Sequence, residues 1–306
     1  MAWRRAGPST NGSSGMRVVA WNTGWNVSER VVRRQAEAVV SLGADVTFFS
    51  EWSPQKDRVT SAGEIRSSSG HLRGAEMARI GLPHQQHEHL SDRRDDGLAW
   101  SGAFWGVLAA SRRPITKKLR MPPLFAPGYW LEVAHEDSGL TLVGVRMPAW
   151  DGRRVHLRRE LWIWMLQQFD RLASTPTIVL GDFNTERAYP SPSTDFKYCG
   201  DLLRSVTAVR GWKDPYAVIG TSEQPTFWHR QSCRRIDHAL VSPAFKGSID
   251  SIDAPTSVGA LVLSGPSRAD DGHQRGRLSD HAPLVIDVTP SGARRLNPDR
   301  SRVWVS

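Results

Sequence analysis

Acidic and amide side chains follow three short apolar segments of this sequence at the point where each segment ends. Asn22 follows MRVVAW, Glu51 follows DVTFFS, and TIVLG is followed by Asp182 and, two positions later, by Asn184. A strand can hold such a side chain rigidly at the rim of a sheet and leave it within reach of solvent. Taken alone, each residue is more typical of a turn or cap, because Asp and Asn are frequent turn residues.

Two further polar motifs occur later in the chain. RIDH contains Arg235 and Asp237 and begins a strand-like segment, and SDH contains Asp280 and His281 just before the last such segment. With the residues above, they provide acidic oxygens for a hard cation, an Asp-x-Asn pair, and a histidine with carboxylates to orient it. This combination, unlike any single residue, indicates metal-assisted hydrolysis of a phosphoester.

Strand-like and helix-like segments alternate around these motifs. Strand patterns cover 16–21, 45–50, 104–110, 130–134, 140–145, 177–180, 236–241 and 283–288, and helical patterns cover 28–42, 154–173 and 201–209. The second helix carries an apolar stripe on one face, formed by Leu157, Leu161, Met165, Phe169 and Leu172. Interleaved strands, hairpins and helices predict a layered α/β (α+β) fold.

The polar segment 53–97 is predicted to form long loops with a little helix. It contains HQQHEH, in which His84, His87 and His89 superficially resemble a metal site. Because no partnering carboxylates stand at helical spacing, a solvated loop is the preferred interpretation.

Composition and charge give weaker information. The 306 residues are 39% hydrophobic and 23% charged, as in an ordinary globular protein. The net charge of +9 favours a polyanionic partner such as nucleic acid or an anionic lipid surface. The arginine and lysine pairs are scattered along the chain, however, so an arginine-rich soluble surface explains the charge equally well.

Targeting signals are sparse. The basic N-terminus lacks the apolar region of a signal peptide, and no run of about 18 apolar residues is present. Cys199 and Cys233 lie in no metal-binding or disulfide pattern. We therefore expect a cytoplasmic protein without a membrane span. The expected division is a disordered arm at 1–15, one domain at 16–290 and a C-terminal tail at 291–306.

Six segments, in this order between residues 18 and 288, resemble the endonuclease/exonuclease/phosphatase (DNase I-like) superfamily: VVAWNTGWN, DVTFFSEW, GVLAASRRPI, TIVLGDFNTE, QPTFWHRQSCRRIDHALVS and LSDHAPLVIDV. This group includes DNase I-like nucleases, exonuclease III-like repair enzymes, sphingomyelinases and inositol polyphosphate phosphatases. The resemblance implies a four-layered α/β/β/α sandwich with an active site across the sheet edges.

The resemblance also implies roles for the residues named above. Asn22, Glu51 and Asp280 would hold Mg²⁺ or Mn²⁺, which take oxygen ligands and need few protein groups. Asp182 would orient and deprotonate the attacking water, and Asn184 would donate to a phosphate oxygen.

His281 would contact the phosphate, with Asp237 accepting a hydrogen bond from its other ring nitrogen. Arg146 stands where the family usually has His or Tyr. It would either clamp a phosphate or be a structural residue. Trp228 and Arg235 are further candidates for substrate binding, although a core position is the more frequent role for such a tryptophan.

These expectations combine into a divalent-metal-dependent phosphodiester hydrolase, a nuclease that cleaves DNA or RNA by in-line attack of water. A phosphatase or phosphodiesterase acting on a phosphorylated lipid or small metabolite is the alternative enzyme. The alternative that is not an enzyme is a member of the fold that binds nucleic acid without catalysing a reaction. The sequence leaves the choice between endonuclease and exonuclease activity open, and also the oligomeric state.

Overall fold

The structure of the chain is a computed structural model that describes residues 15–24, 27–52, 57–59, 65–67, 69–88, 106–118, 123, 128–149, 155–229, 232–266 and 276–291. Apart from residues 15 and 291, the predicted N-terminal arm and C-terminal tail lie outside the described residues. Within the described part, no helix is both long enough and apolar enough to cross a membrane.

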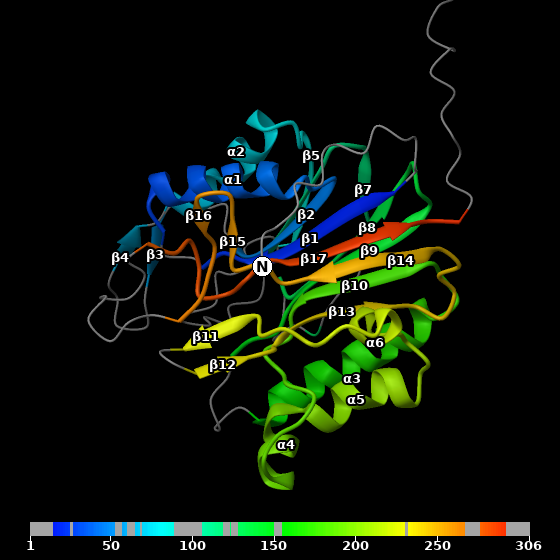
Figure 1. Ribbon diagram of the computed structural model, residues 1–306. Coiled ribbons are helices and arrows are strands. Elements are labelled where there is room, and N and C mark those ends of the chain that lie inside the picture. The colour runs from blue at the N-terminus through cyan, green and yellow to red at the C-terminus, as the bar shows by residue number, and fades with distance from the viewer. Residues whose placement is uncertain are drawn as a thin grey trace, which may run out of the picture.

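Two β-sheets form the centre of the molecule (Figure 1). The six-stranded sheet contains β1 (Met16–Asn22), β2 (Val46–Trp52), β5 (His84–Glu88), β6 (Gly106–Ser111), β14 (Ser248–Asp253) and β17 (Leu284–Thr289). The five-stranded sheet contains β7 (Ile115–Lys118), β8 (Trp130–His135), β9 (Leu140–Arg146), β10 (Thr177–Asp182) and β13 (Asp237–Val241). Their strand orders are β14-β17-β1-β2-β6-β5 and β13-β10-β9-β8-β7.

Helices cover the outer face of each sheet (Figure 1). The six-stranded sheet is covered by α1 (Glu29–Leu42) and by α2 (Arg73–Arg79), which follows the short 3-10 helix η1 (Ser69–Leu72). The five-stranded sheet is covered by α3 (Val155–Leu172) and α5 (Gly200–Ala208). The result is a four-layered α/β/β/α sandwich, which confirms the predicted fold class.

Strand alternation explains how one sequence supplies three apolar layers. In β1, Val18 and Ala20 pack between the two sheets, whereas Val19 and Trp21 face the helix layer of α1. On the other side, the predicted stripe of α3 packs on the five-stranded sheet, and only Leu157 of its five members is partly exposed. The sheets are thus buried on both faces, as their continuous apolar strands require.

Two glycines allow backbone contacts that a side chain would block. A Cβ atom at Gly144 in β9 would lie 2.3 Å from the ring of Phe48 in β2, so the two sheets approach closely there. Gly181 has a φ of 139°, and a Cβ atom there would lie 2.1 Å from the carbonyl oxygen of Val145. Gly181 immediately precedes Asp182, so this glycine permits the close packing of β9 and β10 beside a site residue.

The loop expected at HQQHEH is wrong for residues 84–88, which form the edge strand β5, paired antiparallel with β6. This strand is polar because it lies at the sheet edge, and its amides find tertiary partners. Gln85 donates to the carbonyl oxygen of Gly74 over 2.7 Å, and Gln86 donates to that of Ile115 over 3.3 Å. Local pattern alone does not reveal such partners. His89 lies outside the described residues.

Other short elements were not predicted from the sequence. They are β7 and β14 of the two sheets, β3 (Asp57–Val59), β4 (Ile65–Ser67), β11 (Phe227–His229), β12 (Ser232–Arg234), β15 (Ser257–Val258), β16 (Leu261–Val262), α4 (Pro192–Tyr198) and α6 (Pro215–Ile219). The β11–β12 hairpin bears on the site described next, because Phe227 pairs with His281 through an isolated antiparallel bridge.

Candidate active site

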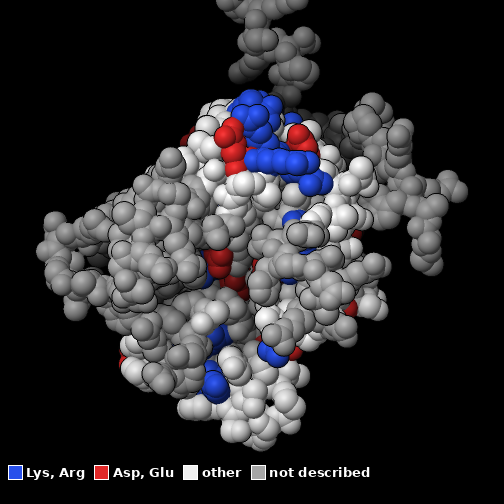
Figure 2. All heavy atoms as spheres, turned by 90° about the vertical axis from the view of Figure 1, so that its left-hand side faces the viewer, with Lys and Arg blue, Asp and Glu red and all other residues white. Residues whose placement is uncertain are grey.

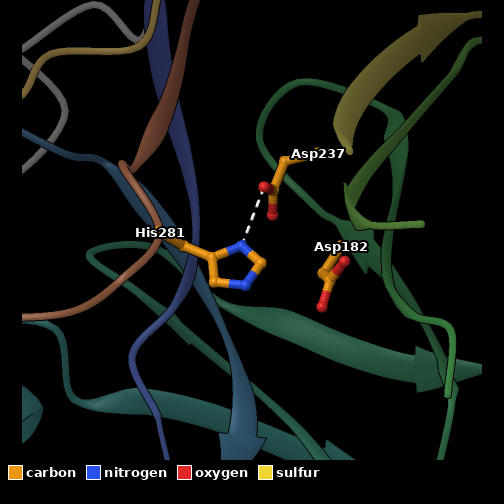
Figure 3. A group of neighbouring side chains, drawn as sticks. All are labelled: Asp182, Asp237 and His281. Carbon is orange, nitrogen blue, oxygen red and sulfur yellow. Dashed lines mark hydrogen bonds and ion pairs between the residues drawn. The ribbon is translucent and has the colours of Figure 1, made fainter. Parts of the chain in front are cut away.

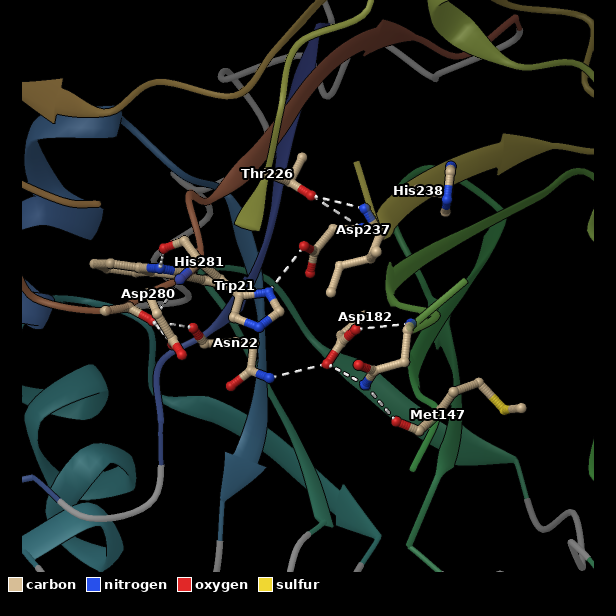
Figure 4. A network of polar contacts seen from close by, with 12 residues as sticks. Trp21, Asn22, Met147, Asp182, Thr226, Asp237, His238, Asp280 and His281 are labelled. Carbon is tan, nitrogen blue, oxygen red and sulfur yellow. Dashed lines mark hydrogen bonds and ion pairs between the residues drawn. The ribbon is translucent and has the colours of Figure 1, made fainter. Parts of the chain in front are cut away.

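Strand ends from both sheets bring the predicted polar residues to one edge of the sandwich. In the six-stranded sheet, β1 and β2 run parallel and Asn22 pairs with Ser50, the residue before Glu51. In the five-stranded sheet, β9 and β10 run parallel and Arg146 pairs with Asp182. Figure 4 shows the side chains of Asn22 and Asp182 meeting between the sheets.

The backbone is distorted at two of these positions. Glu51 and Asn184 have left-handed conformations, with φ values of 61° and 48°. Glu51 is the extra residue of a β-bulge, because the ladder between β2 and β6 shifts register between Ser50 and Trp52. Bulges redirect side chains, and left-handed conformations of non-glycine residues concentrate at functional sites. Here the bulge allows the Glu51 carboxylate to reach Arg146 on the opposite sheet.

Asp182 is held by amide donors from both sheets. Its Oδ2 atom accepts hydrogen bonds from Nδ2 of Asn22 and from Nδ2 of Asn184, each over 2.9 Å. Its Oδ1 atom accepts from the backbone N–H of Asn184, also over 2.9 Å. The Asn184 amide donates as well to the carbonyl oxygen of Met147 over 2.7 Å. In this arrangement, the Asn184 amide orients Asp182.

Burial raises the pKa of Asp182 from its ordinary 3.8 to about 6. The Asp237 carboxylate acts in the same direction, whereas the positive charges of His281 and Arg146 oppose it. A carboxyl group with a pKa near neutrality can exchange a proton at physiological pH. A raised pKa and fixed carboxylate oxygens are two properties that a general base needs, and Asp182 has both.

His281 and Asp237 form a second buried pair (Figure 3). Nδ1 of His281 donates to Oδ2 of Asp237 over 2.9 Å, and the other ring nitrogen faces Asp182. Burial alone would lower the pKa of His281, but the carboxylates of Asp237 and Asp182 outweigh it and raise this pKa to about 10. The ring is thus an imidazolium at neutral pH, fixed in orientation by Asp237.

Asp182, Asp237 and His281 each offer one atom, and these atoms all lie within 4.8 Å of one another. By residue type alone, the three could ligate a metal ion. Because Nδ1 of His281 already donates to Asp237, His281 could ligate an ion only through its other ring nitrogen. A hydrogen-bonded His–Asp pair beside a second carboxyl group also suits acid–base chemistry.

Hydroxyl groups connect this cluster to the surrounding loops. Oγ1 of Thr226 accepts from the backbone N–H of Asp237 over 3.0 Å. Oγ of Ser279 accepts from the backbone N–H of His281 over 3.0 Å and donates to the carbonyl oxygen of Asn22 over 2.6 Å. Ser279 thereby ties the loop of His281 to the end of β1.

The oxygen atoms beside this cluster suit a hard divalent cation. Burial opposes ionisation of Glu51, but the charges of Arg146 and His281 outweigh it and lower the pKa of Glu51. The Asn22 amide lies beside this carboxylate, and Asp280 is half-buried on the loop that Ser279 ties to Asn22. An ionised carboxylate, an amide oxygen and a second carboxylate match the oxygen preference of Mg²⁺ and Mn²⁺.

A buried arginine from each outer layer holds a loop next to the site. Arg73 donates to the carbonyl oxygens at 23–24, directly after β1. Arg158, on α3, donates to the carbonyl oxygens of Pro148 and Asn184, directly after β9 and β10. Both arginines thereby satisfy backbone acceptors that the strand ends leave free.

The sequence as a whole matches the model of the endonuclease/exonuclease/phosphatase family over residues 19–281. The chain belongs to this family. Its members are generally phosphoesterases that use divalent metals. The matched range contains every predicted site residue, from Asn22 to His281.

Solved structures show the same fold at low sequence identity. A Beutenbergia cavernae endonuclease/exonuclease/phosphatase is 18% identical, with a TM-score of 0.61, over 91% of this chain and 72% of that one. The Neisseria 3′ phosphatase NExo, bound to a product DNA hairpin, is 16% identical, with a TM-score of 0.57, over 89% and 98%. An Archaeoglobus fulgidus AP endonuclease is 14% identical, also with a TM-score of 0.57, over 89% and 98%. No curated protein matched this sequence.

Two of the predicted substrate-binding residues of this family member have internal partners. Trp228 is buried against Ala254 and Ala282. Arg235 forms an ion pair with the buried Asp214 over 2.9 Å and lies over the ring of Tyr216. As substrate contacts both stay predictions, and their surroundings favour a structural role.

Several described arginines of the scattered basic pairs also form ion pairs. Arg33 pairs with Glu29, Arg113 with Asp137 and Arg159 with Asp201, among others. On the face drawn in Figure 2, Asp and Glu atoms lie in a hollow, with Lys and Arg atoms around it. Several basic side chains among the described residues are therefore neutralised by acidic partners.

Sequence reasoning missed the residues that position the site. Arg158 had a visible signal, because it lies on the buried face of α3, three residues before Leu161, where a charged side chain needs a buried partner. Ser279 stands inside the SDH motif. Thr226 and Arg73 had no signal, since their partners are separated from them in sequence by 11 and about 50 residues.

Proposed function

We propose that this protein is a divalent-metal-dependent phosphodiester hydrolase, a nuclease that cleaves DNA or RNA by in-line attack of water. One observation carries the proposal. A carboxyl group with a pKa near 6, Asp182, and an imidazolium, His281, face each other in a buried cluster beside the ionised carboxylate of Glu51.

Asp182 is assigned the role of general base. The amides of Asn22 and Asn184 fix both of its oxygens. Above a pH of about 6, Asp182 is ionised and can take a proton from a water molecule placed against the phosphorus atom. Each hydrogen bond from an amide disfavours free rotation of the carboxylate, so the base stays directed at one position.

His281 is assigned the role of electrostatic donor. Its Nδ1–H is occupied by Asp237, which leaves the other ring N–H for a phosphoryl oxygen. Because the ring is already charged and oriented, it stabilises the negative charge that develops as the leaving oxygen departs. The Phe227 ring, 4.8 Å from the imidazole, limits the access of water to one face of it.

Asn22, Glu51 and Asp280 would hold Mg²⁺ or Mn²⁺. Such an ion supplies Lewis-acid stabilisation of the phosphoryl oxygens. Asn184 was expected to donate to phosphate. Since its amide now donates to Asp182 and Met147, we propose that it orients the base instead.

The choice of nucleic acid rests on similarity and charge. The Neisseria enzyme is bound to a product DNA hairpin, the Archaeoglobus protein is named an AP endonuclease, and this chain carries a net charge of +9. Several of the described arginines already form ion pairs with carboxylates and are therefore less available to bind a polyanion. This favours the alternative, a phosphatase or phosphodiesterase for a phosphorylated lipid or small metabolite.

A substrate panel tests the proposal. Supercoiled plasmid, single-stranded RNA and bis(p-nitrophenyl) phosphate are incubated with the protein and Mg²⁺ or Mn²⁺, with EDTA as one control and Asp182→Asn as another. We expect metal-dependent cleavage of a nucleic acid that both controls abolish. Cleavage of the small diester alone would favour the alternative enzyme, and binding of DNA without any cleavage would contradict the catalytic proposal.

A further inference from the structure

Arg146 forms an ion pair that crosses from one sheet to the other. It is the last residue of β9 and pairs in register with Asp182 on β10. Its side chain is only 2% exposed, and its Nη2 atom lies 3.2 Å from Oε1 of Glu51. A guanidinium charge thus already lies against the carboxylate that the proposed function assigns to a metal ion.

The backbone of Glu51 is held beside this partner. It is fixed in a left-handed conformation by the β-bulge, and its neighbour Trp52 is buried. A cation that approaches the Glu51 carboxylate therefore meets the Arg146 charge at close range. An arginine cannot lose its proton to relieve the repulsion.

The same guanidinium fits a phosphate group. Arginine binds carboxylates and phosphates through the same forked donors, so a phosphate group can replace the Glu51 carboxylate as its partner. Asp182 also lies within reach of the Arg146 charge, but amide donors already hold both of its oxygens. Glu51 is thus the carboxylate that an exchange of partners would release.

We propose that Arg146 is a resident cation of the active site, which keeps the affinity of Glu51 for a divalent ion low until a phosphate group engages the guanidinium. Metal and phosphate then bind with positive coupling, and each raises the affinity for the other by the same factor. The inference rests on the proposed function, because it takes Glu51 as a metal ligand.

Calorimetric titration of Mn²⁺ into the metal-free protein tests the inference without any turnover. In the absence of phosphate, we expect Arg146→Met and Arg146→Gln to bind Mn²⁺ about 10-fold more tightly than the unchanged protein. Inorganic phosphate should tighten Mn²⁺ binding to the unchanged protein by a similar factor, and should do so much less in either variant.

Two controls isolate the ion pair. Arg159→Met removes an arginine that pairs with Asp201 on the outer helix layer, and it should leave Mn²⁺ affinity unchanged. The double variant with Glu51→Gln and Arg146→Met should not bind Mn²⁺ more tightly than the unchanged protein. Circular dichroism checks that each variant is folded. If Arg146→Met is unfolded, Arg146→Gln, which can keep one hydrogen bond to Glu51, carries the test.

The outcomes separate this inference from the proposed function. If Glu51→Gln abolishes Mn²⁺ binding but neither Arg146 variant binds more tightly, the resident-cation role is overturned and the metal site stands. If neither the unchanged protein nor the variants bind Mn²⁺, both are overturned. Tighter binding in both Arg146 variants that requires Glu51 supports the inference.

Discussion

The β1–β2 edge and the β9–β10 edge of the sandwich are built alike. Each is a parallel pair of strands that ends in polar residues, and each contains one non-glycine residue in a left-handed conformation, Glu51 at the first edge and Asn184 at the second. In each, a buried arginine from the adjacent outer layer holds the carbonyl oxygens of the following loop, Arg73 at the first edge and Arg158 at the second.

The two edges differ in chemistry. The first presents Asn22 and an ionised Glu51, which are oxygen ligands for a hard cation. The second presents Asp182, with a pKa raised to about 6, and Arg146. The same backbone arrangement therefore positions the proposed metal ligands on one side and the proposed proton acceptor on the other. Changes at the second edge should affect turnover, and changes at the first should affect metal affinity.

The largest expected effect is at the second edge. Asp182→Asn should lower kcat by about 10²–10⁴-fold, because the amide cannot accept a proton from water. Mn²⁺ affinity should change far less than kcat. Steady-state kinetics at saturating metal measure the effect, with circular dichroism to confirm folding. Comparable turnover in a folded Asp182→Asn protein would remove Asp182 from its role.

The pH dependence of kcat/KM examines the same edge. Asp182 must be ionised and His281 protonated, so the profile should rise near pH 6 and fall near pH 10. Asp237→Asn should move both limbs to lower pH, because the Asp237 charge raises both pKa values. It should also lower kcat by about 10²-fold, since His281 loses its orientation. An unshifted falling limb in Asp237→Asn would contradict the pairing.

The pH dependence of the free energy of unfolding should reflect the same two groups, His281 and Asp182. The folded-state pKa of His281 lies above its ordinary 6.5, so its stabilising contribution is complete below about pH 6.5 and is lost as the pH rises through about 10. The raised pKa of Asp182 has the same sign, and its contribution is lost between pH 3.8 and about 6. Urea unfolding of His281→Ala should show a flatter dependence on pH between 6.5 and 10.

Replacing either of the two buried arginines that hold the loops, Arg73 or Arg158, should have a smaller effect. Arg158→Met leaves the carbonyl oxygens of Pro148 and Asn184 without their donor, which costs about 1–3 kcal/mol of stability per unsatisfied group. It should lower kcat several-fold and leave Mn²⁺ affinity near its original value. Arg73→Met should weaken Mn²⁺ binding several-fold and leave kcat near its original value. Equal effects of both variants on kcat and on metal affinity would show that the edges do not divide the chemistry.

The smallest expected effect is at Trp228. Trp228→Leu keeps an apolar side chain against Ala254 and Ala282, and the KM for a nucleic acid substrate should stay within about twofold. If the ring instead stacks on a base, its removal costs about 1–3 kcal/mol of binding and raises KM by 5-fold or more.

Features that depend on neighbours in sequence could be predicted. The helix at 28–42 has Ser28 at its N-terminus and Gly43 in a left-handed conformation at its C-terminus, and the structure has α1 between them. Asn22, Glu51 and Asp182 were found because each follows an apolar segment, and the carboxyl ends of parallel strands meet at one edge.

Features that depend on distant partners could not be predicted. The Arg146–Glu51 pair joins residues 95 positions apart, and nothing near Arg146 in sequence distinguishes a phosphate clamp from an internal ion pair. The polar strand β5 is stabilised by pairing with β6, about 20 residues later, rather than by its own pattern. The orienting role of the Asn184 amide depends on the Met147 carbonyl oxygen of another strand's loop.

The position of a bound metal ion tests the division between the two edges most directly. Crystals grown with Mn²⁺ and a nucleotide product would locate the ion by its anomalous scattering. We predict one peak, ligated at Asn22, Glu51 and Asp280, with the phosphate between it and Asp182. A peak held instead by Asp182, Asp237 and His281 would make these residues metal ligands and contradict their acid–base roles.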